Sequence, residues 1–342
     1  MKAAVLVDTG TIEIREVATP ALGPDDVLIR NAYAGVCGSD LHAFRGKHPF
    51  RKPPVILGHE FAGTVAECGS QVTECRPGDR VTVMPLVPCH TCRLCRMGRQ
   101  NICLHKSVPG VGAWPGSFAE YGIAKAAVTY RLDPATPLQV GVLAEPLAVG
   151  IHGVFRQARV RPGDRVLVLG AGPIGILTAM AARAAGAAEV AVTDILDFNL
   201  AVARELCGAI TYNSGTAAWE DAVALAFPDN FDVAILCSGA PITVRQAIAC
   251  TRRGGRIIVT GMFLDPVGLD LTAVNLNELE LVGSVVYDHQ DFRQAVEWID
   301  AGRFDFQKLV THILPLDMAQ DALALLSDRN EDAVKVLLEI AR

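Results

Sequence analysis

The sequence predicts an α/β protein of two domains, one β-rich and one doubly wound around a parallel sheet. Three observations predict this fold class. The chain has 342 residues, enough for two domains of ordinary size. Its first 36 residues contain short runs rich in β-branched residues, which are typical of strands. From Arg165 onward, apolar strand-like runs alternate with helical segments, as they do in a doubly wound sheet.

The β-rich part is expected to consist of short strands separated by turns. Pro20, Gly23 and Pro24 punctuate the first strands, and the run Arg76-Pro77-Gly78-Asp79-Arg80 forms a turn into the next. A later strand opens within 116–121, and Pro146 suits the first turn of a helix that begins within 144–150. The expected strands are 3–7, 11–16, 27–34 and 81–84.

The second part begins with a largely apolar strand at 165–169, typical of a parallel sheet covered on both faces. The further expected strands are 188–193, 233–237, 256–260 and 279–286, and the expected helices are 176–185, 199–207, 216–226 and 242–249. The tail should form a helix (292–299), a strand (310–314), a helix (317–326) and a closing strand (334–340). We expect this tail to rejoin the first domain, so that residues 1–150 and 289–342 form one domain and 151–288 the other.

Charge and hydropathy exclude several function classes. The formal net charge is −6 and no stripe of Lys and Arg is present, which disfavours a nucleic-acid or anionic-membrane partner. The apolar run at the N-terminus is too short for a signal peptide. The longest uncharged run, 166–182, is broken by three glycines and a proline and is not expected to span a membrane. We therefore expect a cytoplasmic location.

Four cysteines with metal-ligand spacing predict a structural zinc site. Cys89, Cys92, Cys95 and Cys103 are separated by two, two and seven intervening residues. Four thiolates complete a tetrahedral Zn²⁺ and leave no position for water. Disulfide bonds are the alternative, but nothing else in the sequence is typical of a secreted protein. We assign the remaining cysteines to packing, namely Cys68, Cys75, Cys207, Cys237 and Cys250.

Two short segments upstream suggest a second, open metal site. The first places Cys37, Ser39 and His42 close together, and the second contains His59 and Glu60. Mixed thiolate, imidazole and carboxylate ligands are typical of a zinc site that keeps a position for water or substrate. Each segment alone is a weak signal, because a lone cysteine is more often a core residue. Glu145, where a helix begins, is either a cap or a further carboxylate of this site.

The loop 44–54 is basic and contains prolines. We favour a solvated loop over its alternative, the mouth of a pocket for an anionic or hydroxylated substrate.

A glycine motif follows the strand 165–169 at once. Its expected cofactor-binding residues are Gly170, Gly172, Pro173, Ile174 and Gly175. Between a strand and a helix, these glycines allow a tight turn and the close approach of a dinucleotide pyrophosphate to the helix N-terminus. The alternative is a glycine-rich packing turn.

Asp194 ends the next strand, 19 residues after Gly175, where an acid can bond the ribose 2′-hydroxyl. Its carboxylate would repel a 2′-phosphate, and the following residue is Ile195 rather than an arginine. The sequence therefore predicts NAD(H) over NADP(H).

Over essentially its full length the chain resembles the zinc-dependent medium-chain alcohol dehydrogenases. The resemblance rests on Cys37-Gly38-Ser39-Asp40-x-His42, Gly58-His59-Glu60-x2-Gly63-x5-Gly69-x2-Val72, the four cysteines and the glycine motif. It implies a GroES-like β-rich catalytic domain, a Rossmann NAD-binding domain and a homotetramer or homodimer. The chain is most similar to the sorbitol and threonine dehydrogenase branch, because Glu145-Pro146-Leu147 stands where simple-alcohol enzymes usually supply a cysteine.

The resemblance also implies roles for the site residues and two zinc ions per subunit. Cys37 and His59 would bind the catalytic zinc, Glu60 would be a ligand that comes and goes, and Glu145 would bind directly or through water. Ser39 would touch the substrate hydroxyl, and His42 would pass its proton onward by way of the nicotinamide ribose. Asp40 would orient its neighbours. Candidate specificity residues are Phe44, Arg51, Phe118, Tyr287 and His289.

The resemblance therefore implies hydride transfer from a secondary alcohol to NAD⁺. The substrate is a small hydroxylated molecule, and a polyol, a sugar acid, a cyclitol and L-threonine all remain open. Alternatives from other classes are a zinc-ribbon binding protein without catalysis and a zinc-free quinone reductase on the same scaffold. The acidic charge disfavours the first, and the combination of Cys37, His59 and Glu60 disfavours the second.

Overall fold

The structure is a computed structural model that describes residues 1–327 and 332–340. The chain forms two compact units. The first unit comprises Met1–Glu145 and Asp288–Arg342, and the second comprises Pro146–Tyr287. The sequence predicted domain boundaries after residues 150 and 288. The boundaries observed in the structure lie after Glu145 and Tyr287.

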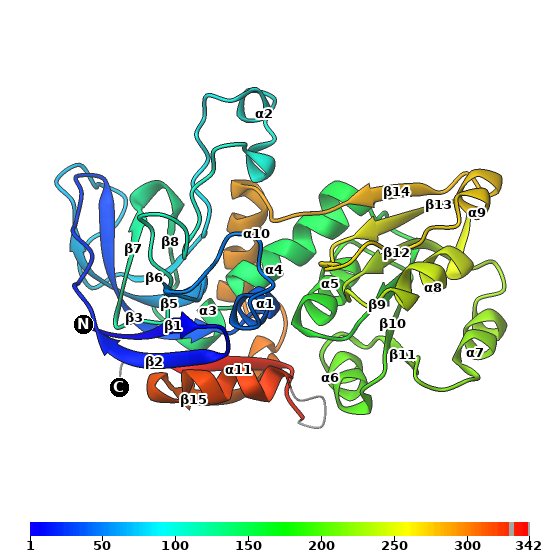
Figure 1. Cartoon of the computed structure of the whole chain (residues 1–342). Helices are drawn as coiled ribbons and strands as arrows, with labels where there is room; N and C mark the ends of the chain where they lie inside the picture. The colour runs from blue at the N-terminus through cyan, green and yellow to red at the C-terminus, as the bar shows by residue number, and fades with distance from the viewer. Residues whose placement is uncertain (328–331, 341–342) are drawn as a thin grey trace. The chain divides into compact units, whose positions relative to one another are not determined.

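The first unit is built on two sheets (Figure 1). A seven-stranded sheet has the order β15-β16-β3-β5-β6-β8, with β7 paired to β3, and a three-stranded sheet has the order β2-β1-β4. The strands are β1 (Lys2–Asp8), β2 (Thr11–Glu16), β3 (Asp26–Gly35), β4 (Val55–Ile56), β5 (Glu60–Cys68), β6 (Arg80–Val83), β7 (Tyr121–Lys125), β8 (Thr129–Arg131), β15 (Val310–Pro315) and β16 (Lys335–Glu339).

β3 pairs with both β5 and β16, which brings residues of these two strands together at one end of the sheet. Gly35, the last residue of β3, lies opposite Glu60 on β5 and opposite Leu337 on β16. β16 has an apolar, buried run because both of its faces are covered. The register therefore brings the start of β16, near the end of the chain, beside the start of β5.

Short helices complete the first unit. α1 begins after Cys37, and a capping box between Cys37 and Asp40 fixes its first turn. α10 begins after Asp288, whose side chain accepts backbone N–H groups of the first turn. The helices are α1 (Gly38–Phe44), α2 (Arg93–Arg96), α3 (Leu138–Gly141), α10 (His289–Asp300) and α11 (Ala319–Ser327), with 3₁₀ turns at Gln100–Ile102, Ala126–Val128, Phe306–Leu309 and Leu316–Met318. α4 (Ala144–Ile151) spans the boundary between the units.

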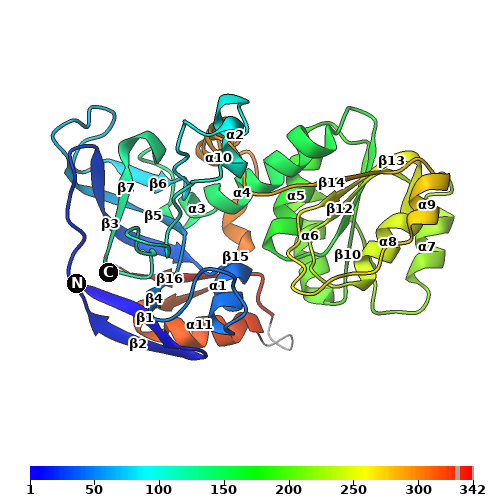
Figure 2. The same cartoon turned by 45° about the horizontal axis from the view of Figure 1, so that its top comes forward.

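The second unit is a six-stranded parallel sheet with the order β11-β10-β9-β12-β13-β14 (Figure 2). This is the strand order of a doubly wound dinucleotide-binding fold. Its strands are β9 (Arg165–Leu169), β10 (Glu189–Asp194), β11 (Ile210–Asn213), β12 (Phe231–Leu236), β13 (Thr251–Val259) and β14 (Glu280–Gly283). Its helices are α5 (Pro173–Ala184), α6 (Asp197–Cys207), α7 (Trp219–Ala226), α8 (Ile242–Cys250) and α9 (Leu271–Leu276), with a π-helical segment at His152–Ala158.

The α/β prediction is confirmed, and several element boundaries differ from the expected ones. α7 begins at Trp219 rather than at 216, because Thr216 closes a turn by donating its backbone N–H and its hydroxyl to the Asn213 carbonyl. β14 ends at Gly283 rather than at 286, where Val286 adopts a positive φ of 55°. β7 begins at Tyr121, after the expected start of that strand.

One helical stretch, Leu138–Ala158, is long and apolar enough to cross a membrane by length and composition alone. Of its most apolar window, 78% is buried inside the protein. A mostly buried stretch of this kind is also what the core helix of a soluble protein looks like.

Candidate active site

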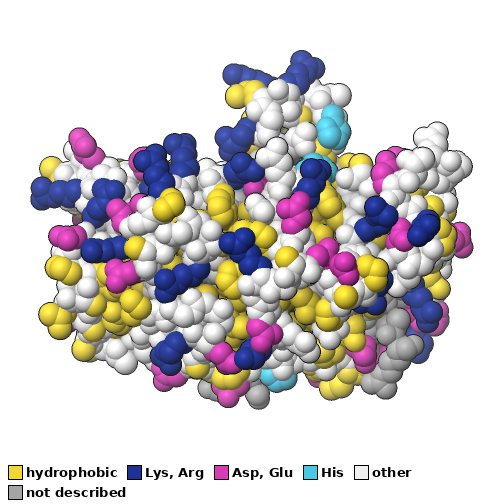
Figure 3. Space-filling view, turned by 180° about the vertical axis from the view of Figure 1, so that it is seen from behind, with side chains coloured by type: hydrophobic (Ala, Val, Ile, Leu, Met, Phe, Trp, Pro, Cys, Tyr) yellow, Lys and Arg dark blue, Asp and Glu magenta, His cyan; other side chains and the backbone are white. Residues whose placement is uncertain are grey.

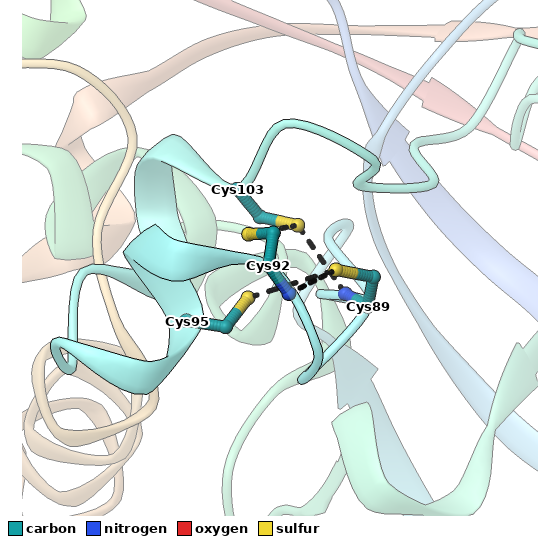
Figure 4. A group of neighbouring side chains, drawn as sticks. All are labelled: Cys89, Cys92, Cys95 and Cys103. Atoms are coloured by element: carbon teal, nitrogen blue, oxygen red, sulfur yellow. Dashed lines mark hydrogen bonds between the residues drawn. The ribbon is translucent and has the colours of Figure 1, made fainter.

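Four cysteines converge in the first unit, namely Cys89, Cys92, Cys95 and Cys103 (Figure 4). We call the segment 89–103 that contains them the cysteine lobe. The sulfur atoms of Cys89 and Cys95 are 4.0 Å apart, and those of Cys92 and Cys103 are 3.9 Å apart. Tetrahedral zinc with Zn–S bonds of about 2.3 Å requires sulfur atoms about 3.8 Å apart. All four are free cysteines, so the lobe has the geometry of a closed metal site and not of a disulfide pair.

Backbone N–H groups donate hydrogen bonds to two of these sulfur atoms. The N–H of Cys92 donates to the sulfur of Cys89, and the N–H groups of Cys89 and His105 donate to the sulfur of Cys103, each at 3.3 Å. Hydrogen bonds from the Thr91 hydroxyl and then from backbone N–H groups lower the pKa of Cys89 to about 5. A thiolate is the form that binds a metal.

A second cluster, also in the first unit, contains Cys37, His59 and Glu60. One ligand atom from each residue lies within 4.8 Å of the others. Cys37 stands at the N-terminus of α1, and His59 and Glu60 stand at the entry of β5. Gly58 makes the preceding turn with φ of +89°, and a Cβ there would lie 2.4 Å from the Phe118 ring. The structure thus brings together three of the four expected ligands of the open zinc site.

Asp40 contacts the segments that carry the cluster residues. It is fully buried, and its carboxylate accepts the N–H groups of Cys37 (3.1 Å) and Gly58 (3.2 Å). Its Oδ1 atom lies 3.6 Å from Nδ1 of His59. Burial would raise the pKa of Asp40, but the neighbouring His59 outweighs it and the pKa is about 2. With Nδ1 turned toward Asp40, Nε2 is the ring nitrogen left for a metal, an arrangement common among zinc-binding histidines.

Lys335 is a functional neighbour that the sequence reasoning missed. Its ammonium forms an ion pair with Glu60, and both side chains are 1% exposed. It also donates to the Val36 carbonyl at 3.1 Å. Burial would lower the pKa of Lys335, but the charges of Glu60 and then Cys37 raise it. The available signal was a lysine inside the otherwise apolar run 334–338.

Glu145 is not one of the three residues of the ligand cluster. It is buried in the first turn of α4, and its charge acts on Lys335. Its carboxylate is not part of the group formed by Cys37, His59 and Glu60.

Ser39 and His42 lie on α1, next to the cluster. The Ser39 hydroxyl oxygen accepts a hydrogen bond from Arg51 Nη1 at 3.3 Å. Burial, followed by the charges of Arg45 and Lys47, lowers the pKa of His42, so its imidazole is neutral at pH 7. A neutral imidazole can accept a proton.

The interpretation of 44–54 as a solvated loop is wrong at His48 and Arg51, which are 2% and 7% exposed. Nδ1 of His48 accepts the backbone N–H groups of Phe50 (3.4 Å) and Arg51 (3.1 Å), which folds the loop inward. Burial and then the charge of Arg51 lower the pKa of His48 to about 4, so this histidine is a neutral acceptor.

The other candidate specificity residues lie in different surroundings. Phe118 and Tyr287 are fully buried in the first and second units, respectively, as core residues are. His289 starts α10, and its Nδ1 lies 2.8 Å from the Tyr130 hydroxyl. Phe44 is half-buried at the end of α1.

The glycine motif of the second unit has the geometry of a dinucleotide cradle. Gly170 has φ of +109°, and a Cβ on Gly175 would lie 1.7 Å from the Gly170 carbonyl oxygen, so helix and strand pack too closely for any side chain. A Cβ on Gly172 would meet nothing within 4 Å, which leaves open space at the start of α5. No side chain caps α5, which begins at Pro173, so its N-terminal N–H groups are available to an anion.

Asp194 closes the cradle at the end of β10. Its Oδ2 atom accepts the N–H of Ala171 at 2.6 Å. Its Oδ1 atom accepts the N–H groups of Ile195 (2.8 Å) and Leu196 (3.0 Å). The carboxylate is therefore fixed beside the glycine motif, and the donor groups present fit a dinucleotide.

Comparison with known proteins agrees with both sites. Residues 23–134 match the family model "Alcohol dehydrogenase GroES-like domain", and residues 173–301 match "Zinc-binding dehydrogenase". A sorbitol dehydrogenase of Arabidopsis thaliana is 34% identical over 99% of this chain and 95% of its own length. An L-idonate 5-dehydrogenase of Vitis vinifera is 33% identical over 99% of this chain and 94% of its own length.

A solved structure has the same fold throughout. It is a putative zinc-binding dehydrogenase from Sinorhizobium meliloti bound to NADP, with a TM-score of 0.91 and 32% identity over 99% of this chain and 98% of the other. The matched segments contain the four cysteines, the Cys37 cluster and the whole of α5, the helix that follows Gly172. The chain belongs to the zinc-binding alcohol dehydrogenase family.

Proposed function

We propose that the protein oxidises a secondary alcohol of a polyol or a sugar acid and transfers the hydride to NAD⁺. The observation that carries this proposal is the cluster of Cys37, His59 and Glu60, whose ligand atoms lie within 4.8 Å of one another. Such a mixed set is typical of catalytic rather than structural zinc. The sorbitol and L-idonate dehydrogenases among the relatives support the substrate class.

Cys37, His59 and Glu60 would hold the catalytic zinc, with Glu145 as a further ligand, directly or through water. Zinc bound there would act as a Lewis acid that lowers the pKa of the substrate hydroxyl. Asp40 would fix the ring of His59, because its carboxylate faces Nδ1 at 3.6 Å. Lys335 would compete with the metal for Glu60, because its ammonium pairs with the same carboxylate.

Ser39 and His42 would accept and pass on the proton of the substrate hydroxyl. The Ser39 oxygen accepts from Arg51, so the hydroxyl hydrogen of Ser39 is free to turn toward the substrate. His42 is neutral at pH 7 because burial lowers its pKa, and it can take up the proton that the substrate loses.

The glycine motif and Asp194 would bind the cofactor. NAD⁺ supplies the hydride acceptor when it is bound. Gly172 leaves room for the pyrophosphate, and Asp194 would bond the ribose hydroxyls and disfavour a 2′-phosphate. We propose NAD⁺ as the preferred cofactor, although the Sinorhizobium meliloti relative was solved with NADP.

Cys89, Cys92, Cys95 and Cys103 would hold a second, structural zinc that rigidifies their loop. We further propose a cytoplasmic homo-oligomer, a tetramer or a dimer, without a nucleic-acid or membrane partner. The formal charge of −6 supports the absence of a nucleic-acid partner. Figure 3 supports it too, because basic and acidic side chains are interspersed on the face it shows.

A screen of NAD⁺ reduction over polyols, aldonates, cyclitols and L-threonine tests the function, with zinc measured on the same preparation. We expect two zinc ions per chain and turnover with a polyol or a sugar acid. Cys37→Ala should abolish turnover while NADH still binds, because the glycine motif lies in the second unit. Near-normal kcat in this variant would refute the catalytic metal site.

Two other functions would give different results. Turnover with L-threonine alone would identify a threonine 3-dehydrogenase, which would use the same metal and cofactor groups. One zinc ion per chain together with a nucleic-acid gel shift would identify a zinc-ribbon binding protein.

A further inference from the structure

Arg51 is a buried cation next to the proposed reacting centre. Its side chain is 7% exposed, and its guanidinium makes two hydrogen bonds. Nε donates to the Pro109 carbonyl at 3.2 Å, and Nη1 donates to the Ser39 hydroxyl at 3.3 Å. These contacts, together with the bond from its backbone N–H to His48, hold the side chain in one orientation.

Part of the guanidinium remains available to a ligand. A guanidinium has five N–H donors, and the two bonds above use one on Nε and one on Nη1. Nη2 makes no hydrogen bond with the described residues, and it is not among their fully buried, unpartnered side-chain atoms. The guanidinium therefore keeps N–H donors for a ligand, on a side chain that also bonds Ser39.

No acid in the described part of the chain neutralises this cation directly. Among residues 1–327 and 332–340, no carboxylate oxygen lies within 4.0 Å of the Arg51 guanidinium. Asp40 is the acid whose charge interacts with Arg51, but its oxygens are occupied by Cys37, Gly58 and His59. A buried charge without a paired partner is costly, and an incoming anion would offset that cost.

The geometry points to Arg51 as a specificity residue that binds an anionic oxygen group, a carboxylate or a phosphate, on the hydroxylated substrate. This inference rests on the proposed function and narrows its substrate from polyols in general to sugar acids or polyol phosphates. A planar guanidinium binds either group through two parallel N–H donors. Because Arg51 also bonds Ser39, it would place the anionic end of the substrate relative to the hydroxyl that reacts.

Substrates that share a carbon skeleton and differ at one end test the inference. We would measure kcat/KM of the zinc-loaded full-length enzyme with galactitol, galactonate and galactitol 1-phosphate, and with the corresponding glucitol set. We expect an anionic member to exceed the neutral polyol by about 10- to 100-fold, the range of one or two charge-assisted hydrogen bonds. Preference for galactonate would identify a carboxylate site, and preference for the phosphate ester a phosphate site.

Arg51→Gln should lower the ratio of kcat/KM for the anionic member to that for the neutral polyol by about 10- to 100-fold. Arg51→Lys should lose less of this ratio, because it keeps the charge but not the fork. Lys52→Gln is the matched control, since Lys52 is an exposed neighbour in the same loop that donates to the Gly46 carbonyl. It should leave the ratio unchanged. Thermal unfolding and zinc content of each variant check the fold.

The outcomes separate this inference from the proposed function. If Arg51 only positions Ser39, Arg51→Gln will lower kcat for all members equally and leave the ratio unchanged, which overturns the inference. A wild-type enzyme that prefers neutral polyols overturns it too, and both results leave the dehydrogenase proposal standing. Failure of every member of the wider alcohol screen to reduce NAD⁺ contradicts the proposed function itself.

Discussion

Lys335 shows how one buried residue can stabilise a candidate metal ligand, Glu60. Glu60, at the start of β5, is buried. A buried carboxylate without a cation beside it is costly and tends to be neutralised. Lys335 supplies that cation from β16. Burial would lower the pKa of Lys335, but the charge of Glu60 raises it. The carboxylate of Glu60 thus has a buried partner other than the proposed metal.

Replacing this lysine should destabilise the protein strongly. Lys335→Met leaves the Glu60 carboxylate buried and unpaired, and we expect the free energy of unfolding to fall by about 3–5 kcal/mol. The double variant Lys335→Met with Glu60→Gln should lose less than the sum of the single changes, because it removes both charges. Denaturant unfolding of the zinc-loaded protein measures all four states of the cycle.

Lys125→Met provides the control for that cycle. Lys125 pairs with Asp25 and Asp26 on the surface, where ion pairs contribute about 0–1 kcal/mol. Equal losses for Lys125→Met and Lys335→Met would show that burial does not set the strength of the inner pair.

Asp194 should decide between the two nicotinamide cofactors. Asp194→Asn removes the charge and keeps one of the two oxygens that now accept backbone N–H groups. Combined with Ile195→Arg, it should shift the ratio of kcat/KM for NADP⁺ to that for NAD⁺ upward by at least about 10-fold, because an arginine can bond the 2′-phosphate. Steady-state kinetics with both cofactors measure the ratio. A wild-type preference for NADP⁺ would refute the role given to Asp194.

At the scale of the element, the turn from β9 into α5 contains two glycines with different surroundings. Gly175 lets the helix approach the Gly170 carbonyl, whereas Gly172 faces open space. The same sequence motif therefore contains two different physical requirements, one for the fold and one for the ligand.

Alanine at each position should reveal this difference. Gly175→Ala places a Cβ 1.7 Å from a backbone oxygen, and we expect a loss of about 1–3 kcal/mol in unfolding free energy. Gly172→Ala should unfold at a temperature close to that of the wild type and bind NADH more weakly, because its methyl group would occupy the space for the pyrophosphate. Thermal unfolding and NADH fluorescence titration measure the two effects. The opposite pattern would mean that the cradle is misassigned.

At the scale of the whole molecule, patterns local in sequence predicted most of the fold. The apolar strand, the glycine turn and the helix at 165–185 are consecutive, so period and turn chemistry identify them. The cysteine lobe was equally visible, because its four ligands lie within 15 residues and converge in the structure.

Contacts between distant parts of the chain could not be predicted in this way. Lys335 meets Glu60 across 275 residues because β3 pairs with both β5 and β16, a register that no local pattern encodes. Arg51 is in a basic, proline-containing loop that resembles a solvated one, and its burial follows from bonds to Ser39, Pro109 and His48. Glu145 was a candidate ligand from its place at a helix start and from the resemblance. Its charge acts on Lys335 in the structure, and it is not one of the three residues of the ligand cluster.

The distribution of sites over the molecule yields a calorimetric prediction. Both metal clusters belong to the first unit, and the glycine motif belongs to the second. Chelation of zinc should therefore lower the unfolding temperature of one transition, because metal binding contributes directly to folding. NADH at about 100 times its Kd should stabilise the other by about 2.7 kcal/mol and raise it by several degrees.

Differential scanning calorimetry of the holoenzyme, the chelated protein and the NADH-saturated protein measures both transitions, and Gly172→Ala serves as the control. That variant should lose the NADH shift and keep the zinc shift, because its glycine lies in the second unit, away from both metal clusters. A single transition that zinc and NADH shift together would show that the two units unfold as one. In that case the stability of the cofactor cradle would depend on metal bound elsewhere in the chain, and zinc loss would weaken NADH binding as well as turnover.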